Sequence, residues 1–297
     1  MSRVLIAATV RQRPATLRAF LAGLDALNLD GLEAKRVFID DCTEPEASEL
    51  LRAADADVVE VHAAPRPGYR IDERGHAWSE AAVWRVAALK DDLLRRAVDG
   101  GFDHCLLLDS DLVLQPQTVR HLIGCAVPVV AEVFWTTWSL QGPQPLPQVW
   151  VSHPYEMAPV RRGEQPSTVE RQDRAARWLS HLASGVLTPV GGLGACTLFQ
   201  VDVVRRLFRE SGTVFGPLPS LAFWGEDRHF CLRCDALRIP RWADSRCPPY
   251  HIYRPSDLDR LEAWWKEVRA RSTAAEASPR AAAPGGGPAD ADPVAPR

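Results

Sequence analysis

Apolar and polar residues in the first part of the chain fall into blocks that predict strands and helices in turn. Short apolar runs at residues 4–9, 36–39 and 58–61 have the length and composition of buried strands. Between the first two runs, Pro14 precedes apolar residues at helical spacing, and proline is common in the first turn of a helix. Strands that alternate with helices in this order build a parallel sheet with right-handed crossover connections.

The same alternation continues through the rest of the chain. A long amphipathic helix is predicted from residue 78 to about residue 97, and a fully apolar strand follows at residues 105–108. Further strands are predicted at 127–135, 195–199 and 241–247. Further helices are predicted at about 116–123, at 201–210, from the residue after Asp227 to about residue 236, and at 256–268. We therefore predict an α/β fold in a single domain, with a Rossmann-like, mostly parallel central sheet flanked by helices.

Three segments lack a regular apolar pattern. Residues 64–76 contain prolines, glycines and three arginines, which predicts a loop whose arginines could bind phosphate or simply face solvent. Residues 136–185 combine aromatic residues with prolines and glutamines, and we expect this stretch either to contact substrate or to pack as a separate cluster. Residues 272–297 are rich in alanine, proline and glycine, so we predict a disordered tail with too few apolar anchors to fold.

The composition narrows the class of protein. With 297 residues, 46% of them hydrophobic, the chain can bury a large core, and its formal charge of −3 lacks the basic excess expected of a nucleic-acid-binding protein. No apolar run approaches the roughly 18 residues that a membrane-spanning helix needs, and the N-terminus lacks a signal-peptide pattern. We therefore expect a cytoplasmic protein without an integral membrane segment, and the pattern is compatible with a homodimer.

The cysteines carry little chemistry in this pattern. Seven scattered cysteines predict reduced thiols rather than a disulfide framework. Cys231 and Cys234 form a Cys-x-x-Cys pair within a predicted helix, but no second pair accompanies them. This spacing favours core packing over zinc binding or redox chemistry, which stay open as alternatives.

The most informative stretch is the strand end at Asp109-Ser110-Asp111, an Asp-x-Asp (DXD) motif. Three leucines, residues 106–108, run directly into two carboxylates one residue apart. In open α/β sheets, ligands bind beyond the carboxyl ends of the strands, so both carboxylates are expected at the mouth of a cleft. Such oxygen donors suit Mg²⁺ or Mn²⁺ carrying a diphosphate. The alternative is a solvated turn, in which aspartate and serine are also common.

Other acidic residues and a histidine also stand at predicted strand ends or loop starts. Asp40 and Asp41 end the second predicted strand, and Glu226 and Asp227 precede a helix. His251 lies in a stretch rich in proline and tyrosine after the last predicted strand. As alternatives, the Glu226-Asp227 pair could only complement a helix dipole, and the histidine could be a packed loop residue.

Taken in order along the chain, these positions resemble the sequence pattern of the family-two glycosyltransferases, which have the nucleotide-diphospho-sugar transferase (GT-A) fold. The resemblance covers roughly residues 3–255. Its matching segments are residues 4–9, 38–41, 108–111, 192–196 and 225–227, with Phe230, Cys231, Arg233 and His251.

The resemblance implies a role for each matching residue. It implies a nucleotide-sugar pocket formed by Thr9, Arg11, Asp40, Asp41, Lys90, Asp109 and Ser110, a site for Mn²⁺ or Mg²⁺ formed by Asp109, Asp111 and His251, and an acceptor side that includes Gly192, Gly194 and Trp224. It also implies that Asp227 is the catalytic base, with Glu226 beside it. Lys90 stands where the family usually has arginine followed by asparagine, and Asp91 departs from that pattern.

The activity that the resemblance implies is a metal-dependent, inverting transfer of a sugar, of the hexosyltransferase type. The donor would be a UDP- or GDP-sugar, and the acceptor an unidentified sugar, small molecule or polymer. A nucleotide-binding half is expected at about 1–125 and an acceptor-binding half at about 126–271.

Two alternative functions stay open. A nucleotidylyltransferase would usually carry a glycine-rich, basic loop after the first strand, whereas this chain has Arg11 and Arg13 there without the glycines. A non-catalytic sugar-nucleotide-binding module is the third possibility. Retention of the carboxylates at residues 109, 111, 226 and 227 counts against it.

Overall fold

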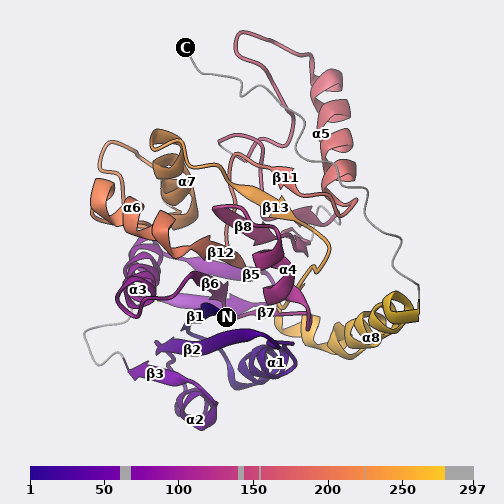
Figure 1. Ribbon diagram of the computed structural model, residues 1–297. Helices are drawn as coiled ribbons and strands as arrows, with labels where there is room; N and C mark the ends of the chain where they lie inside the picture. The colour runs from indigo at the N-terminus through magenta and orange to yellow at the C-terminus, as the bar shows by residue number, and fades with distance from the viewer. Residues whose placement is uncertain (61–67, 140–143, 154, 224, 278–297) are drawn as a thin grey trace. The chain divides into compact units, whose positions relative to one another are not determined.

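The computed structural model describes residues 1–60, 68–139, 144–153, 155–223 and 225–277. Within these residues, eight strands form one central sheet in the order β11-β13-β8-β12-β6-β1-β2-β3 (Figure 1). The strands are β1 (Ser2–Val10), β2 (Leu32–Asp40), β3 (Asp57–Glu60), β6 (His104–Asp109), β8 (Val129–Glu132), β11 (Thr188–Pro189), β12 (Thr197–Gln200) and β13 (Trp242–Asp244).

Most strands of this sheet run in one direction. β1 pairs in parallel with β2 and β6, β2 pairs in parallel with β3, and β8 pairs in parallel with β13. β12 lies antiparallel between β6 and β8, and the short strand β11 is antiparallel to β13. The predicted α/β fold with a mostly parallel central sheet is therefore confirmed. The shared direction brings the carboxyl ends of β1, β6, β8 and β13 to the same edge.

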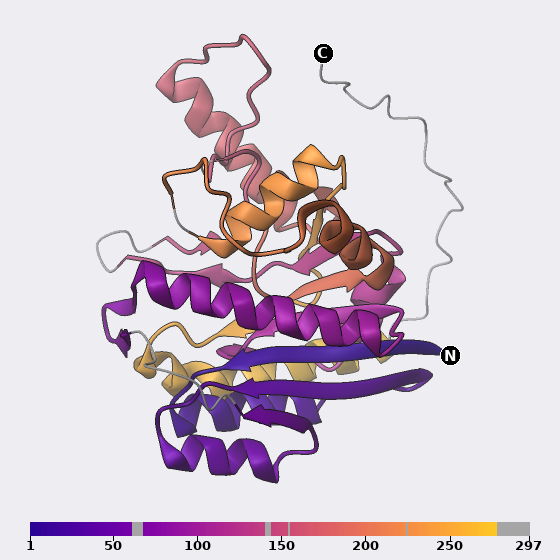
Figure 2. The same cartoon turned by 90° about the vertical axis from the view of Figure 1, so that its left-hand side faces the viewer.

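Helices cover both faces of the sheet (Figure 1 and Figure 2). One face carries α3 (Glu80–Asp99), α6 (Val201–Ser211) and α7 (Glu226–Ala236), and the other carries α1 (Pro14–Asp25), α2 (Pro45–Ala53) and α4 (Thr118–Gly124). A hydrophobic core lies on each face of the sheet, the first core under α3, α6 and α7 and the second core under α1, α2 and α4. Side chains of β1 alternate between the two cores, as the pleat of a strand requires. Leu5 and Ala7 face the first core, and Val4, Ile6 and Ala8 face the second.

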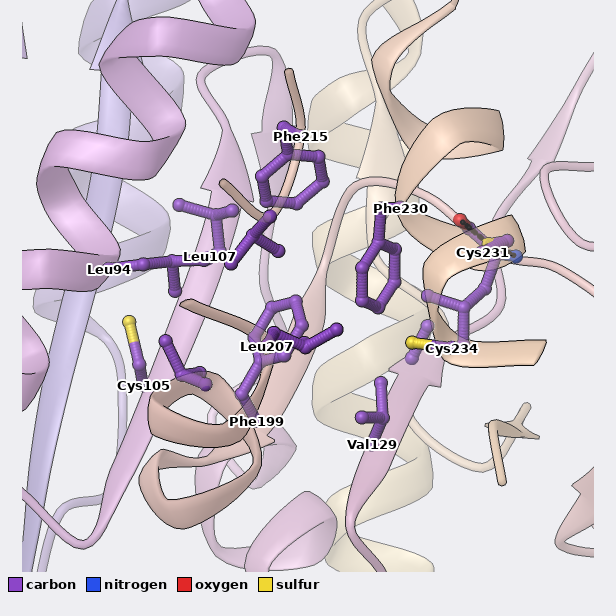
Figure 3. Packing of buried hydrophobic residues seen from close by; sticks show 14 of the residues in the cluster. Leu94, Cys105, Leu107, Val129, Phe199, Leu207, Phe215, Phe230, Cys231 and Cys234 are labelled. Carbon is purple, nitrogen blue, oxygen red and sulfur yellow. Dashed lines mark hydrogen bonds between the residues drawn. The ribbon is translucent and has the colours of Figure 1, made fainter. Parts of the chain in front are cut away.

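Aromatic rings and thiols fill the part of the first core that holds α7 (Figure 3). Phe230 of α7 packs against Phe199 and Phe215, with ring centroids 5.4 and 5.3 Å apart. Cys231 and Cys234 are buried in the same core as free thiols, which confirms the predicted packing role. This packing fixes α7, whose first residues are the predicted catalytic carboxylates.

Three two-stranded sheets in the described residues were not predicted from the sequence. They pair β4 (Tyr69–Asp72) with β5 (Gly75–Trp78), β7 (Leu112–Val113) with β14 (Tyr250–His251), and β9 (Trp135–Thr136) with β10 (Leu146–Pro147). The β4–β5 hairpin replaces most of the loop predicted at 64–76, of which residues 64–67 lie outside the described residues.

The β4–β5 hairpin also includes Trp78, which we predicted to begin the long helix. That helix, α3, begins at Glu80 because the Ser79 hydroxyl caps it, accepting a hydrogen bond from the Ala82 amide at 3.2 Å.

The segment from residue 127 to residue 185 also differs from its prediction. The single strand predicted at 127–135 is divided into β8 and β9. Within the stretch that we expected to be irregular lies helix α5 (Thr168–Leu182), which begins with a capping box of Ser167 and Glu170.

The chain divides into two compact units, Met1–Asp259 and Arg260–Arg297. A 3-10 helix, η1 (Pro255–Arg260), ends at their boundary, and helix α8 (Leu261–Ala277) lies in the second unit. The backbone of α8 continues to Ala277, past residue 272 where the predicted tail begins. None of the helices in the described part of the chain combines the length and the apolar character that crossing a membrane requires.

Candidate active site

A cleft of about 640 Å³ lies beyond the carboxyl ends of β1 and β6. Its walls include residues of α3, the β4–β5 hairpin, β14 and the start of α7. The predicted site residues that line the cleft are Thr9, Arg11, Asp41, Lys90, Asp109, Ser110, Asp111, Gly194, Glu226, Asp227 and His251. The fold therefore brings most of the predicted site together, from segments far apart in the sequence.

The DXD motif stands where β6 leaves the core. β6 pairs with β1 so that Asp109 lies beside Thr9, and both end at the cleft. Asp109 is partly exposed to the cleft, whereas Ser110 and Asp111 are buried. The predicted position of the motif at the end of a buried strand is confirmed.

A buried ammonium group joins the motif to the carboxylates of α7. Lys90 is 2% exposed, and its Nζ lies 3.2 Å from Asp109 Oδ1. The same Nζ donates a hydrogen bond to Glu226 Oε1 at 3.0 Å and lies 3.7 Å from Asp227 Oδ1. The ring of Phe215 lies 5.5 Å from Nζ and adds an aromatic face to the site of this cation. Three carboxylates from two segments of the chain thus surround one charge.

Burial and charge set the protonation states of these groups. Burial alone would lower the pKa of Lys90, but the carboxylates of Asp109, Asp227 and Glu226 outweigh it and raise that pKa well above its usual value. Burial raises the pKa of Asp227 to about 8, against the effect of Lys90, and Glu226 and Asp109 add to the increase. Burial likewise raises the pKa of Asp109. Asp227 therefore exchanges its proton near neutral pH, which suits a general base.

Lys90→Met should destabilise the protein, because it leaves three carboxylates next to an apolar side chain. Removing one partner of a buried ion pair costs about 3–5 kcal/mol, and we expect the lower end, about 3 kcal/mol, because Asp109 and Asp227 are partly exposed to the cleft. The pKa values of Asp109 and Asp227, which are already raised in the wild type, should rise further in this variant. Protonation then relieves the repulsion, so the loss in free energy of unfolding should shrink as the pH falls from about 8 to about 5.

Urea denaturation at the two pH values measures both effects. Lys35→Met is the matched control, since Lys35 forms an exposed ion pair with Asp57 at 2.5 Å. Loss of such a surface pair should cost at most about 1 kcal/mol. Equal losses in the two variants would contradict the role assigned to Lys90.

Two buried histidines flank Asp111. His251 Nε2 lies 3.6 Å from Asp111 Oδ2, and His76 Nε2 lies 3.9 Å from the same oxygen. The pairing of β14 with β7 places His251 opposite Leu112, the residue that follows Asp111. His251 Nδ1 lies 2.7 Å from Thr136 Oγ1, and when Nδ1–H donates to this hydroxyl, Nε2 is available to a cation.

The donor atoms around Asp111 fit a divalent cation. Among the described residues, Asp111 Oδ1 and His76 Nε2 are buried without a hydrogen-bond partner, and a bound cation would relieve this cost. Burial would raise the pKa of Asp111, but His251 and His76 outweigh it and lower that pKa. Burial lowers the pKa of His76. Both shifts favour carboxylate and neutral imidazole, which are the forms that bind metal ions.

His76 was not predicted as a site residue, and the β4–β5 hairpin positions it. Its Nδ1 lies 3.0 Å from the Tyr69 hydroxyl, and its ring stacks on Tyr253 with centroids 4.7 Å apart. Gly75 has a φ of 107°, and a Cβ there would lie 2.6 Å from the Tyr253 ring, so only glycine allows this approach. No local pattern marks His76, because its role depends on contacts with the far end of the chain.

Arg85 is a second site residue that the sequence did not indicate. Its guanidinium binds Asp41, with Nη2–Oδ1 at 2.7 Å and Nε–Oδ1 at 3.1 Å. Arg11 Nη1 lies 3.8 Å from Asp41 Oδ2, and the Arg11 guanidinium lies 5.8 Å from the Tyr69 ring. No sequence pattern marks Arg85, because its role depends on the approach of α3 to Asp41, the residue that follows β2. Together these groups form a polar wall with one aromatic face.

Some predicted residues lie elsewhere. Asp40 is buried and is not among the described residues that line the cleft; its carboxylate accepts the Cys42 amide at 2.9 Å. Gly192 lies under Trp150, whose ring occupies the space that a Cβ would need, so Gly192 shapes the cleft through that ring. Trp224 lies outside the described residues. Asp91, which follows Lys90, accepts a hydrogen bond from the Phe215 amide at 2.9 Å and so holds the loop between α6 and α7.

Residues of the aromatic-rich segment lie both in the cleft and in the core. Trp138, Trp150 and Tyr155 line the cleft, and Trp138 and Tyr155 are 39% and 51% exposed. Trp178 of α5 is instead buried in the first core.

Arg254 joins three segments beside the cleft. This side chain is buried, and its Nε donates to the Glu73 carbonyl at 3.0 Å, in the turn of the β4–β5 hairpin. Nη1 and Nη2 donate to the carbonyls of Thr137 and Trp138 at 2.7 and 3.4 Å, just after β9. One guanidinium thus connects the hairpin, the chain after β9 and the chain after β14.

No protein-family model and no curated protein sequence matches this chain significantly. The chain is similar in structure to S. aureus TarS 1-349, with 12% sequence identity and a TM-score of 0.48 over 90% of this chain and 65% of that chain. It is also similar to TarS 1-349 in complex with UDP-GlcNAc (12% identity, TM-score 0.44, 84% of this chain and 57% of that chain) and in complex with UDP (13%, 0.46, 89% and 65%). The chain thus spans less than two thirds of the length of these structures, and we base its function on its own residues.

Proposed function

We propose that this protein is a metal-dependent, inverting glycosyltransferase with the GT-A fold. It would move a sugar from a UDP- or GDP-sugar to an acceptor hydroxyl, as hexosyltransferases do. The observation that carries this proposal is the convergence at Lys90. Asp109 of the DXD motif and Asp227, the proposed base, lie 3.2 and 3.7 Å from one buried ammonium nitrogen. The proposed cation-binding and proton-accepting groups therefore share one cleft.

The residues around the end of β6 would hold the donor diphosphate and its cation. Asp111, His76 and His251, with Asp109 next to them in the cleft, offer oxygen and nitrogen ligands for Mn²⁺ or Mg²⁺. Imidazole ligands favour Mn²⁺ over Mg²⁺. A bound cation stabilises the charge that the departing nucleoside diphosphate gathers. Arg11 and the Tyr69 ring, on the same wall, are suited to contact the phosphates and the base.

Asp227 would accept the proton of the acceptor. As the acceptor oxygen bonds to the anomeric carbon, the bond from that carbon to the diphosphate breaks, and its electron pair stays on the diphosphate. Attack on the face opposite the leaving group inverts the anomeric centre, as it does in inverting glycosidases. A pKa of about 8 makes the Asp227 carboxylate a stronger base than an ordinary aspartate, and Lys90 offsets part of the cost of ionising it.

The two alternative functions receive less support from the site. The chain between β1 and α1 contains Arg11 and Arg13 but no glycine, so the phosphate-binding loop expected of a nucleotidylyltransferase is missing there. A non-catalytic binding module has no need of a cleft carboxyl group that titrates near neutral pH, and Asp227 is such a group.

A nucleotide panel and a turnover assay together test the proposal. Either UDP or GDP, added with Mn²⁺, should raise the melting temperature of the full chain, since a ligand at 100 times its Kd adds about 2.7 kcal/mol to the stability of the native state. Slow release of UDP or GDP from the matching nucleotide-sugar supports a transferase. Formation of a nucleotide-sugar from a nucleoside triphosphate and a sugar phosphate would identify a nucleotidylyltransferase instead. Binding without turnover of any donor or acceptor would favour the binding module.

Gly194→Ala should slow the proposed reaction by displacing the base. A Cβ at residue 194 would lie 2.0 Å from Asp227 Oδ2 and 2.7 Å from Asp227 Cγ, so the carboxylate has to move. A misplacement of this size can cost about 100-fold in rate, and donor binding should be retained. Steady-state kinetics and nucleotide titrations measure the two quantities. Gly68→Ala is the control, because a Cβ there meets none of the described residues within 4 Å. Normal turnover in Gly194→Ala would contradict the placement of the base.

A further inference from the structure

A second group of metal-ligating side chains lies at the ends of β8 and β13. Glu132 and Asp244 are the last residues of these strands and are partners in the parallel register. His121 lies on α4, and Cys125 caps the same helix four positions later, which places both side chains on one side of it. None of these four residues is among the described residues that line the catalytic cleft.

The donor atoms of this group converge. His121 Nε2 lies 2.8 Å from Asp244 Oδ1 and 3.5 Å from Glu132 Oε1. One ligand atom each from His121, Cys125 and Asp244 lie within 4.8 Å of one another. Tetrahedral ligands at about 2.0–2.3 Å from Zn²⁺ are roughly 3.3–3.8 Å apart, so the Cys125 side chain has to move toward the other three groups for all four to reach one ion.

Glu132 has an oxygen that the surrounding protein does not satisfy. Glu132 and Asp244 are both 0% exposed. Among the described residues, Glu132 Oε1 has no hydrogen-bond partner, while Oε2 accepts the Cys247 amide at 3.3 Å. A buried carboxyl oxygen without a partner is costly, and either a bound cation or a proton on the carboxyl would relieve that cost. The oxygen that lacks a partner is the one that faces His121.

We propose that His121, Cys125, Glu132 and Asp244 bind one Zn²⁺ ion in a closed structural site, separate from the catalytic cation. Imidazole, thiolate and carboxylate are the ligands that Zn²⁺ takes, whereas Mg²⁺ avoids thiolate. Arg246 holds Asp244 from the surface side, with Nη2–Oδ2 at 2.6 Å, as outer partners of metal ligands commonly do. The positive charges of Zn²⁺ and Arg246 together balance the negative charges of the Cys125 thiolate and the Glu132 and Asp244 carboxylates. Binding releases the thiol proton, and the His121 Nε2 that faces Asp244 has to bind the metal ion without a proton on it.

The competing interpretation is a metal-free polar network, in which a protonated His121 lies between the two carboxylates. That network satisfies His121 and Asp244, which are 2.8 Å apart, and leaves Cys125 Sγ with two weak contacts, to the His121 carbonyl at 3.5 Å and from Arg246 Nη2 at 3.9 Å. The two interpretations differ in whether the Cys125 thiol ionises on adding a metal ion, and this can be measured directly.

Titration with Co²⁺ tests the site. The full chain, produced without a polyhistidine tag and treated with a chelator, is titrated while its near-ultraviolet spectrum is recorded. Thiolate coordination produces a charge-transfer band, and the described residues of the catalytic cleft include no cysteine, so a band does not come from the cleft, and variants assign it among the seven cysteines. We expect about one equivalent of Co²⁺ to develop the band and Zn²⁺ to remove it by displacement.

Three variants assign the ligands. Cys125→Ser should lose the band and weaken metal binding at this site by about 100-fold or more. Cys247→Ser, which changes another half-buried cysteine in the same region, should keep the band, and so should Asp111→Asn, which changes the catalytic site. Circular dichroism shows whether each variant folds. If Cys125→Ser does not fold, the wild-type titration alone decides whether the chain has a thiolate metal site. No band in the wild type, or a band that persists in folded Cys125→Ser, would overturn the proposal.

Discussion

Asp227→Asn is expected to bind the nucleotide-sugar donor normally and to turn it over about 100-fold more slowly, or slower still. The amide keeps the shape of the carboxylate but cannot accept the acceptor proton, and general-base catalysis contributes about 10²–10⁴ in rate. The fold should survive, because Lys90 keeps its closer contacts to Glu226 and Asp109 at 3.0 and 3.2 Å. Single-turnover kinetics with saturating acceptor separate the chemical step from binding.

The pH dependence of the wild type checks the same residue in another way. Because the pKa of Asp227 is about 8, its carboxylate is a minority species at neutral pH, so kcat/KM should rise with pH and level off above about 8. The residual activity of Asp227→Asn should lack this rise. Glu226→Gln is the comparison variant and should keep the rise but move it to lower pH, because Glu226 helps to raise the pKa of Asp227. Normal turnover in Asp227→Asn, with loss in Glu226→Gln, would exchange the roles of the two residues.

Removal of divalent cations is expected to abolish turnover, and addition of Mn²⁺ or Mg²⁺ to restore it. Asp111→Asn should lower metal-dependent turnover by more than about 100-fold, beyond the loss typical of outer-shell partners. The reason is that Asp111 is the carboxylate that both His76 and His251 face. Calorimetric titration of Mn²⁺ in the presence of UDP or GDP measures the metal affinity without relying on turnover.

Two further variants define this metal response. His76→Gln removes one proposed imidazole ligand and should weaken Mn²⁺ binding, though less than Asp111→Asn. Cys125→Ser should respond to Mn²⁺ as the wild type does, since Cys125 is not among the described residues of the cleft. Full activity after exhaustive chelation, or normal Mn²⁺ binding in Asp111→Asn, would refute the assignment.

The strand end with the DXD motif could be predicted because its determinants are local. Leu106, Leu107 and Leu108 are at most 4% exposed, and the run becomes polar at the residue where β6 ends. The acidic first turn of α7, at Glu226 and Asp227, is also a local pattern. Once the strands are known to be parallel, their carboxyl ends have to meet at one edge.

Of the two histidines around Asp111, His251 was expected there only because the sequence resembles a known family, and His76 was not predicted at all. β7 and β14 have two residues each, which is too short for any periodic pattern, yet their pairing places His251 beside Asp111. His76 reaches the same carboxylate on a hairpin that packs against Tyr253, far away in the sequence. Such contacts depend on the tertiary structure, and the local sequence carries no sign of them.

Helix α5, by contrast, had a signal that we did not use. Ser167 accepts a hydrogen bond from the Glu170 amide at 3.3 Å, and the Glu170 carboxylate accepts one from the Ser167 amide at 2.8 Å. A serine followed three residues later by glutamate is a recognised helix start. Trp178 and Leu182 are the buried residues of this helix, so its apolar stripe is narrow and the helical period is weak.

The three carbonyls that Arg254 binds have a consequence for how the site opens. The hairpin that carries His76, residues 137–138 and the chain after β14 all depend on one buried guanidinium, so none of them can detach without leaving buried donors unpaired. These segments should behave as one cooperative opening unit, with similar free energies of opening in amide hydrogen exchange. Whatever enters or leaves past His76 must then wait for the whole unit to move, which couples the residence time of a ligand to a single conformational step.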